Sequence, residues 1–425
     1  MIFLQREKLY NGVYLNDIHD FKFKTTSLMA CIHMPLDRQQ AAKNALLPLV
    51  LKRGSAAYPT FSDIEQTLAY LCGASFQSFV LKKGDDQILC FSISMLSDRY
   101  SPNGEKIFQP ACRLLFDVLL HPCLENGVFR KAYVEAEKQN LIDMIESMVN
   151  DKQSYALWRC YEVMCEGEPF GISEMGDVDA VRAIDENSLY EQYQRVLSES
   201  VIDFFVCGQA DMEDFKTVAK AAFAGMERAD ASYPDNRLFC GNPQQKKVTD
   251  QFAATNQAKL SLGFTTSISD RDEAFFALQV ANSIFGSGTH SKLFNNVREK
   301  LSLAYYAFSR IERRKGLMLV GMGIEEANYQ LAFDETIKQL DNLKNGDVSD
   351  YEYESAKASL INQARSFQDS QLSMIDFALN QILKGSDLTI KEYCDRIAQV
   401  TLEQAVAAAK QIRLDTIYLL TNKKN

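Results

Sequence analysis

Residues able to carry chemistry are few and scattered in this chain. The four histidines, His19, His33, His121 and His290, lie far apart, and none has a second histidine or a cysteine three or four residues away. That spacing places two metal ligands on one helical face, so the sequence predicts no locally built metal site. There is also no Gly-x-Ser-x-Gly turn and no cysteine signature to support a serine or cysteine nucleophile.

A second group of polar residues lies in the run that ends at Tyr305. Arg298 and Tyr305 are seven residues apart, across the end of an expected helix and the start of the next strand. Two simple interpretations stay open: Arg298 as a cation at a helix C-terminus, and Tyr305 as a ring packed under the sheet. Tyr306 is the alternative phenol, because neighbouring side chains on a strand point to opposite faces.

Two glycines precede this run, in Gly286-Ser287-Gly288-Thr289. Gly-rich turns before helices expose backbone N–H groups to phosphates. The Lys-Ser/Thr ending of a P-loop is missing, however. We therefore interpret Gly286 and Gly288 as a turn that lets two helices meet closely.

The run from Gly286 through Arg298 to Tyr305 resembles the second domain of zinc metallopeptidases of the insulinase, pitrilysin and mitochondrial processing peptidase type. In that family the arginine and the tyrosine hydrogen-bond carbonyl groups of the substrate backbone, a task suited to a donor-rich guanidinium and a phenol. The resemblance therefore implies substrate-binding roles for Arg298 and Tyr305. It covers nearly the whole chain and is more specific in the second half.

The first domain of that family carries an inverted zinc motif, His-x-x-Glu-His, whose histidines bind zinc and whose glutamate accepts a proton from the bound water. When Lys52-Arg53-Gly54-Ser55 is aligned with the end of the motif, Ala45, Pro48 and Leu49 occupy its three positions. The downstream glutamate ligand falls at Met144. None of these side chains binds zinc as the family does, and no register shift within 41–58 supplies a replacement.

The resemblance thus implies a chain that is not an enzyme on its own. It implies a non-catalytic, substrate-binding subunit of a heterodimeric zinc metallopeptidase that holds no cofactor itself. The partners implied are a homologous subunit that bears the zinc motif and the zinc, and a peptide substrate; a homodimer is the alternative for the isolated chain. The alternative function is an inert scaffold or binding protein with the peptidase fold. The resemblance also implies a link to modification of elongation factor P.

Length and composition limit the number of domains, the cellular location and the kinds of partner that we expect. At 425 residues the chain suits two domains of about 200 residues, each able to bury most of its apolar surface. No apolar run approaches the roughly 20 residues that span a bilayer, so we expect no membrane segment. Ten cysteines without a Cys-x-x-Cys pair, and no secretory leader, predict the cytoplasm. A net charge of −10 without a basic stripe argues against nucleic acid as a partner.

The two halves of the sequence repeat one another. A helical stretch at 134–142 is echoed at 354–361, and a helix followed by a strand-like run at 184–207 is echoed at 400–420. A repeat at half the chain length predicts a duplicated α+β fold. Each copy is expected to be a mainly antiparallel sheet covered by helices, as the resemblance to LuxS and processing peptidases implies.

Residues 225–245 show no such periodicity and are rich in turn-forming residues. This composition predicts a linker between domains at 1–224 and 246–425. In the second half we expect strands at 258–265, 304–312 and 317–324, and long helices at 326–344 and 349–383. In the first half, Ser62 followed by Glu65 predicts a capping box at the start of a helix over 62–72.

Overall fold

The computed structural model describes residues 4–252 and 257–423, which form two compact units. Unit 1 contains Met1–Glu146, Ile172–Asp235 and Phe367–Asp387. Unit 2 contains Ser147–Gly171, Asn236–Ser366 and Leu388–Asn425. The units therefore differ from the contiguous domains 1–224 and 246–425 expected from the sequence. Within the expected linker, the chain leaves unit 1 after Asp235 and enters unit 2 at Asn236.

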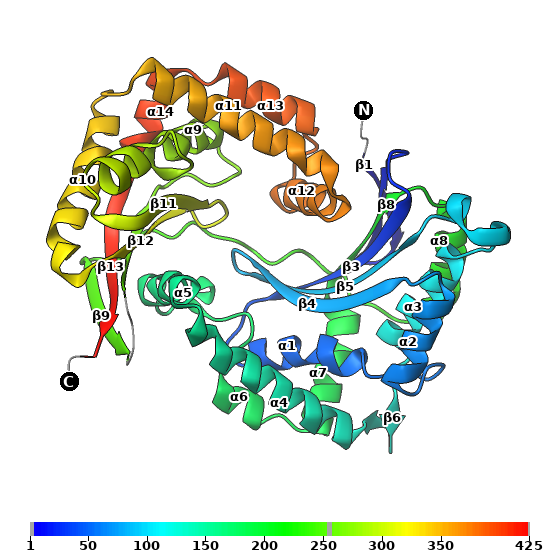
Figure 1. Cartoon of the computed structure of the whole chain (residues 1–425). Helices are drawn as coiled ribbons and strands as arrows, with labels where there is room; N and C mark the ends of the chain where they lie inside the picture. Colours follow the sequence, from blue (N-terminus) through cyan, green and yellow to red (C-terminus); the bar gives the residue numbers. More distant parts are fainter. Residues whose placement is uncertain (1–3, 253–256, 424–425) are drawn as a thin grey trace. The chain divides into compact units, whose positions relative to one another are not determined.

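Unit 1 is built on a six-stranded sheet in the order β1-β2-β8-β3-β5-β4 (Figure 1). Neighbouring strands pair antiparallel, except for β2 with β8. The strands are β1 (Leu4–Tyr10), β2 (Val13–His19), β3 (Thr25–Pro35), β4 (Ser75–Lys83), β5 (Asp86–Leu96) and β8 (Val201–Gly208), with a short pair β6 (Leu124–Glu125) and β7 (Val128–Phe129). The helices are α1 (Ala41–Leu51), α2 (Phe61–Tyr70), α3 (Phe108–Leu120), α4 (Lys131–Ser147), α6 (Val178–Arg182), α7 (Glu186–Glu199), α8 (Met212–Ala222) and α12 (Gln371–Lys384).

Unit 2 is built on a five-stranded sheet in the order β11-β12-β10-β13-β9, again antiparallel except for β13 with β9. The strands are β9 (Lys246–Phe252), β10 (Ala258–Thr265), β11 (Ala304–Glu312), β12 (Leu317–Ile324) and β13 (Arg413–Asn422). The helices are α5 (Lys152–Met164), α9 (Phe275–Gly286), the π-helical segment η5 (Leu293–Lys300), α10 (Tyr329–Lys344), α11 (Asp350–Ser366), α13 (Ile390–Gln399) and α14 (Leu402–Ala409). Within the described ranges, no helix has both the length and the apolar character needed to cross a bilayer.

The strand orders confirm the predicted duplication and the α+β class. Read from one edge, the sheet of unit 1 begins β4, β5, β3, β8, β2, and the sheet of unit 2 runs β11, β12, β10, β13, β9. In both sheets the fourth strand is the last strand of its repeat, and the fifth strand pairs parallel to it. Each edge strand follows a buried helix and a second helical segment: α1 and α2 precede β4, and α9 and η5 precede β11. The segment that carries Arg298 therefore corresponds to α2 in the other repeat.

One face of the unit 1 sheet is covered by helices from the same half of the sequence. Alternate residues of β3, such as Leu28, Ala30 and Ile32, are buried in one cluster with the apolar side chains of α1, α3 and α7. Most of the opposite face is also apolar, with Met29, Cys31, Ile88, Cys90, Phe205 and Cys207 pointing that way. Burial of that second face requires another helix.

Helix α12, from the second half of the sequence, covers this second face (Figure 1). Its buried residues in this cluster are Met374, Ile375, Ala378, Leu379 and Leu383. Gln371 fixes its first turn: Nε2 donates to the carbonyl oxygens of Thr25 (2.8 Å) and Cys207 (2.7 Å). The helix is therefore an integral part of unit 1.

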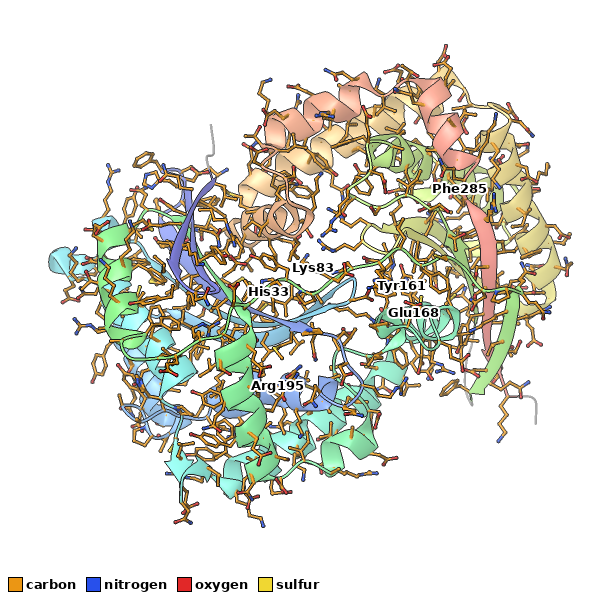
Figure 2. All side chains as sticks on the ribbon, turned by 180° about the vertical axis from the view of Figure 1, so that it is seen from behind. His33, Lys83, Tyr161, Glu168, Arg195 and Phe285 are labelled. Atoms are coloured by element: carbon orange, nitrogen blue, oxygen red, sulfur yellow. The ribbon has the colours of Figure 1, made fainter. Side chains whose placement is uncertain are left out.

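Helix α5 has the reciprocal role in unit 2. Ala156, Leu157 and Cys160 are buried with side chains of β12 and β13. A Cβ at Gly263 of β10 would lie 2.7 Å from Met164 Sδ, so glycine lets α5 approach the strand without displacing the Met164 side chain. Tyr161 of α5, labelled in Figure 2, also packs edge-on against Phe170 at 5.1 Å.

The first part of the expected linker is anchored on unit 1. The Arg228 guanidinium donates to the backbone oxygens of Asn11, Leu197 and Ser200. Burial lowers the pKa of Arg228 to about 10, and these carbonyl groups satisfy its donors in place of water. The chain up to residue 235 is therefore held by specific contacts although it has no regular secondary structure.

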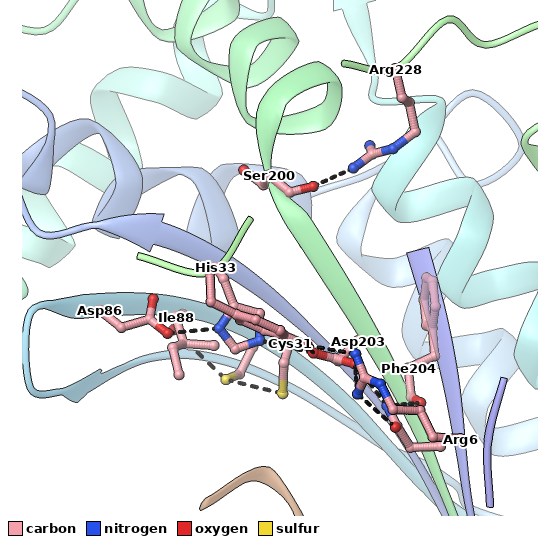
Figure 3. Close-up of polar contacts among 12 residues, drawn as sticks. Arg6, Cys31, His33, Asp86, Ile88, Ser200, Asp203, Phe204 and Arg228 are labelled. Carbon is pink, nitrogen blue, oxygen red and sulfur yellow. Dashed lines mark hydrogen bonds and ion pairs between the residues drawn. The ribbon is translucent and has the colours of Figure 1, made fainter. Parts of the chain in front are cut away.

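A buried network of charges attaches the next part of this segment to the sheet (Figure 3). His33 lies between two carboxylates: Nδ1 is 2.7 Å from Asp86 Oδ2, and Nε2 is 3.3 Å from Asp203 Oδ2. Arg6 Nη1 is 2.7 Å from Asp203 Oδ1, and the Tyr233 hydroxyl donates to Asp203 Oδ2 at 2.5 Å. Three strands and the linker thus meet at one carboxylate, Asp203.

The electrostatics of this network favour a protonated imidazole. Burial on its own lowers the pKa of His33, but the charge of Asp86 and the hydrogen bonds to the Asp203 and Asp86 carboxylates raise it to about 10. Burial likewise raises the pKa of Asp203, yet the hydrogen bond and charge of His33 together with Arg6 hold it below its usual range. Each ring nitrogen of His33 thus faces a buried carboxylate, and we interpret the cluster as structural.

We expect Leu379→Ala to destabilise unit 1, although Leu379 lies in the second half of the sequence. The side chain is 1% exposed within the α12 cluster, so the cavity should reduce the free energy of unfolding by about 2–5 kcal/mol. Hydrogen exchange should show the loss of protection in β3 and β8. Leu331→Ala, at a leucine that is 60% exposed, is the control; loss of protection in β10 and β13 instead would contradict the assignment of α12.

We expect His33→Gln to lower the free energy of unfolding by about 3–5 kcal/mol near neutral pH, because two buried carboxylates lose their shared cation. The folded pKa of His33 lies above its ordinary value of 6.5, so its stabilisation is complete below pH 6.5 and is lost as the pH rises to about 10. The difference from wild type should narrow over that window in denaturant titrations. His19→Gln, at an exposed histidine, is the control, and a pH-independent difference would contradict the account.

Candidate functional site

The expected zinc positions lie on α1, a helix packed into the unit 1 core. Ala45 is 3% exposed, Pro48 is buried and Leu49 is half-buried. Residues three and four positions apart share a helical face, which is the geometry that a zinc motif needs. The three side chains end in carbon, however, and zinc takes nitrogen, sulfur or oxygen ligands.

The fourth expected position, Met144, is 48% exposed near the end of α4. Its neighbour Asp143 accepts a hydrogen bond from Gln139 at 2.7 Å on the exposed side of the helix. Across the part of the chain that the structure describes, no group of three or more histidine, cysteine, aspartate or glutamate side chains could hold a metal ion. The residues present do not fit zinc.

The turn that follows the expected zinc motif is nevertheless well ordered by specific contacts. Arg53, directly after α1, pairs with Glu137 of α4, and the Ser55 hydroxyl donates to Asp117 of α3. A Cβ at Gly54 would lie 2.5 Å from the Pro59 carbonyl oxygen, so glycine is required there. The turn that follows the motif is therefore fixed by specific contacts, while the ligands on α1 are absent.

The other histidines also lack a catalytic setting. His290 Nε2 lies 3.2 Å from Ser283 Oγ, and burial lowers the pKa of His290. His121 Nδ1 is 3.3 Å from Asp117, and the His19 ring packs edge-on against Phe21. Each contact is local and structural.

The two glycines of the turn have steric roles. A Cβ at Gly286, the last residue of α9, would lie 2.5 Å from Ser309 Oγ and 2.7 Å from its backbone nitrogen. Gly288 has φ +115°, and its Cβ would lie 2.9 Å from the His290 ring. The Cβ at Gly286 would also lie 2.8 Å from Leu293 Cδ1, so α9 closely approaches both strand β11 and the helical segment η5 at Gly286.

Arg298 lies on the π-helical segment η5, a rare conformation that often occurs at functional sites. Its side chain is 43% exposed, with Nε 3.5 Å from Glu299 and the guanidinium 4.7 Å from the centre of the Phe294 ring. The ring face stabilises the cation, and the 43% exposure leaves the guanidinium accessible. Arg298 is thus an accessible donor near the end of the segment.

Tyr305 is the exposed phenol, and Tyr306 is not. Ala304 pairs with Ile324 and Tyr306 with Gly323, so Tyr305 is the extra residue of a β-bulge and is 82% exposed. Tyr306 stacks on Phe308 at 5.9 Å, and burial raises its pKa well above the ordinary value. Tyr305 therefore does not pack under the sheet.

Strand β11 is an edge of its sheet, so one side of its backbone has no neighbouring strand within unit 2. The turn from η5 to β11 is closed by a hydrogen bond from the Leu303 nitrogen to the Val297 oxygen, at 2.9 Å. Arg298 and Tyr305 flank this turn. An open strand edge next to a guanidinium and a phenol can hydrogen-bond an extended peptide.

Sequence reasoning missed one polar feature, a pocket lined by serine and glutamine side chains in unit 1. Its signal is present in the run Leu89-Cys90-Phe91-Ser92-Ile93-Ser94, where serine alternates with large apolar residues. This period of two places the serines together on one face of a buried strand.

Comparison with known proteins identifies the family. The family model described as "Peptidase M16 inactive domain" matches residues 183–360. The chain is 34% identical to the probable inactive metalloprotease YmfF of Bacillus subtilis over 411 residues, covering 97% of this chain and 96% of that protein.

Solved structures with the same fold support this family assignment. A conserved protein from Enterococcus faecalis superposes with a TM-score of 0.91 at 30% identity, covering 99% of both chains. A peptidase M16 inactive domain from Pseudomonas fluorescens shares the fold with a TM-score of 0.81 at 18% identity, covering 99% of this chain and 98% of that one. With the apolar residues at the zinc positions of α1, these matches show that the chain belongs to the M16 peptidase family and to its inactive relatives.

Proposed function

We propose that this chain is the non-catalytic, peptide-binding subunit of a heterodimeric zinc metallopeptidase in the cytoplasm. The observation that carries the proposal is the accessible pair Arg298 and Tyr305 beside the open edge of β11. The ten free thiols of the chain support a reducing compartment.

The pair suits peptide binding because both groups donate hydrogen bonds from a rigid base. Arg298 projects from η5 with its guanidinium against Phe294, which limits its motion. Tyr305 projects from the bulge on the edge strand. Together they would hold successive carbonyl oxygens of an extended chain and keep it in one register.

The proposal assigns the chemical step to a second chain. Ala45, Pro48 and Leu49 offer no ligand and no proton acceptor, so this chain binds and orients the peptide only. Activation of water and proton transfer would be supplied by the zinc site of a homologous partner that carries the intact motif. No contact in the described residues bears on elongation factor P, and that link is not part of the proposal.

The test mixes the purified chain with a homologous zinc-motif subunit and measures peptide hydrolysis. Arg298→Ala should lower kcat/KM about 10- to 100-fold, the loss expected when a charged hydrogen-bond donor to the substrate is removed. Tyr305→Phe should lower it about fivefold, because only one neutral hydrogen bond is lost. Both side chains are exposed, so melting temperatures should stay unchanged.

Arg396→Ala, at an exposed arginine of α13, is the matched control and should leave the rate unchanged. Equal rates for Arg298→Ala and wild type would remove the proposed role. Co-purification with unrelated proteins and no hydrolysis with any zinc-motif subunit would favour the alternative, an inert scaffold with the peptidase fold.

A further inference from the structure

A small polar pocket of about 230 Å³ lies on the face of the unit 1 sheet opposite α1. Strands β3, β4 and β5 form its floor, and the first turn of α12 forms its wall. The lining residues are Ser27, Ser75, Gln77, Ser92, Ser94, Ser370, Gln371 and Leu372. The volume is below the range typical of drug-sized ligands, so the pocket suits a single small group.

The hydroxyl groups converge because of strand register. Ser94 of β5 is paired with Ser27 of β3 on one side and with Ser75 of β4 on the other. One step along, Ser92 is paired with Gln77. Residues paired across strands share a face, so two adjacent rows of polar side chains form the floor.

The polar groups of this pocket differ in their hydrogen bonding. The Ser27 hydroxyl donates to Gln371 Oε1 at 3.0 Å, and the Gln371 amide is bound to two backbone carbonyl groups. Ser92, in contrast, is 6% exposed and makes no side-chain hydrogen bond to any described residue. Ser92 lines the pocket, so its hydroxyl is available to bond a group that enters it.

The electrostatics around the pocket favour an anionic group. Helix α12 is 14 residues long and begins at the pocket, so its first N–H groups and the positive end of its dipole are directed there. None of the lining residues is acidic. Lys22 lies nearby: its ammonium donates to the carbonyl oxygen of Gln368, two residues before the helix cap, and is also 3.6 Å from Asp20 Oδ2.

We propose that this pocket binds one carboxylate group, held by the hydroxyls of Ser92 and Ser94 and by the first turn of α12. Hydroxyl and backbone N–H donors around a compact anion are the usual means of carboxylate recognition. The carboxylate belongs to an acidic side chain of a bound peptide, an assignment that rests on the proposed peptide-binding function. The preference for a carboxylate does not depend on that function.

The test is calorimetric titration of the full chain, without any partner, with acetate, N-acetyl-aspartate amide and N-acetyl-asparagine amide. The aspartate ligand should bind at least about tenfold more tightly than the asparagine ligand, because only a carboxylate matches the donors. Ser92→Ala and Ser94→Ala should each weaken binding about tenfold. Ser92→Ala should not lower the melting temperature, because the hydroxyl holds no structural hydrogen bond.

Ser78→Ala is the matched control, because Ser78 lies on β4 with the opposite alternation to Ser75 and Gln77 and does not line the pocket. Equal affinity for the aspartate and asparagine ligands, or unchanged binding by Ser92→Ala, would overturn the proposal. Binding of acetate alone would leave the carboxylate site but overturn its assignment to a peptide. None of these readouts involves hydrolysis or Arg298, so failure here is distinct from failure of the proposed function.

Discussion

The exchange of one helix between the two sequence halves is the constraint on which this structure depends. Each sheet carries apolar residues on both faces, and the helices of its own half cover only one of them. Helix α12 buries the second face in unit 1, and α5 does so in unit 2. The first turn of α12 also walls the serine pocket, so a packing requirement of the core creates a polar site at its edge.

The chain combines a preserved frame with lost chemistry. The turn after α1 is held by Arg53, Gly54 and Ser55, whereas the positions that would bind zinc have become part of an apolar helix. In the second repeat, η5 and β11, the counterparts of α2 and β4, carry the exposed Arg298 and Tyr305. This contrast supports the proposed role of a binding subunit, in which donors for a peptide stay accessible and a partner chain would supply the catalytic metal.

Much of this followed from the sequence, and the rest needed tertiary information. Strands 258–265, 304–312 and 317–324 were predicted with their observed bounds, since apolar runs between turns mark them clearly. The segment 349–383 reads as continuous helix, but it breaks at residues 367–370, where Ser370 caps α12. The predicted capping box was also wrong by two residues, because Thr60 and Asp63 form it. Neither the helix exchange nor the bulge that exposes Tyr305 has a local signal, since both arise from pairing between distant segments.

The central claim is that this polypeptide alone cannot hold a catalytic metal. The direct measurement is the zinc content of the purified chain by elemental analysis after dialysis with zinc, combined with an assay of its peptide hydrolysis. The account predicts zinc far below one ion per chain and no hydrolysis above background. One tightly bound zinc per chain, accompanied by hydrolysis that a chelator abolishes, would contradict it.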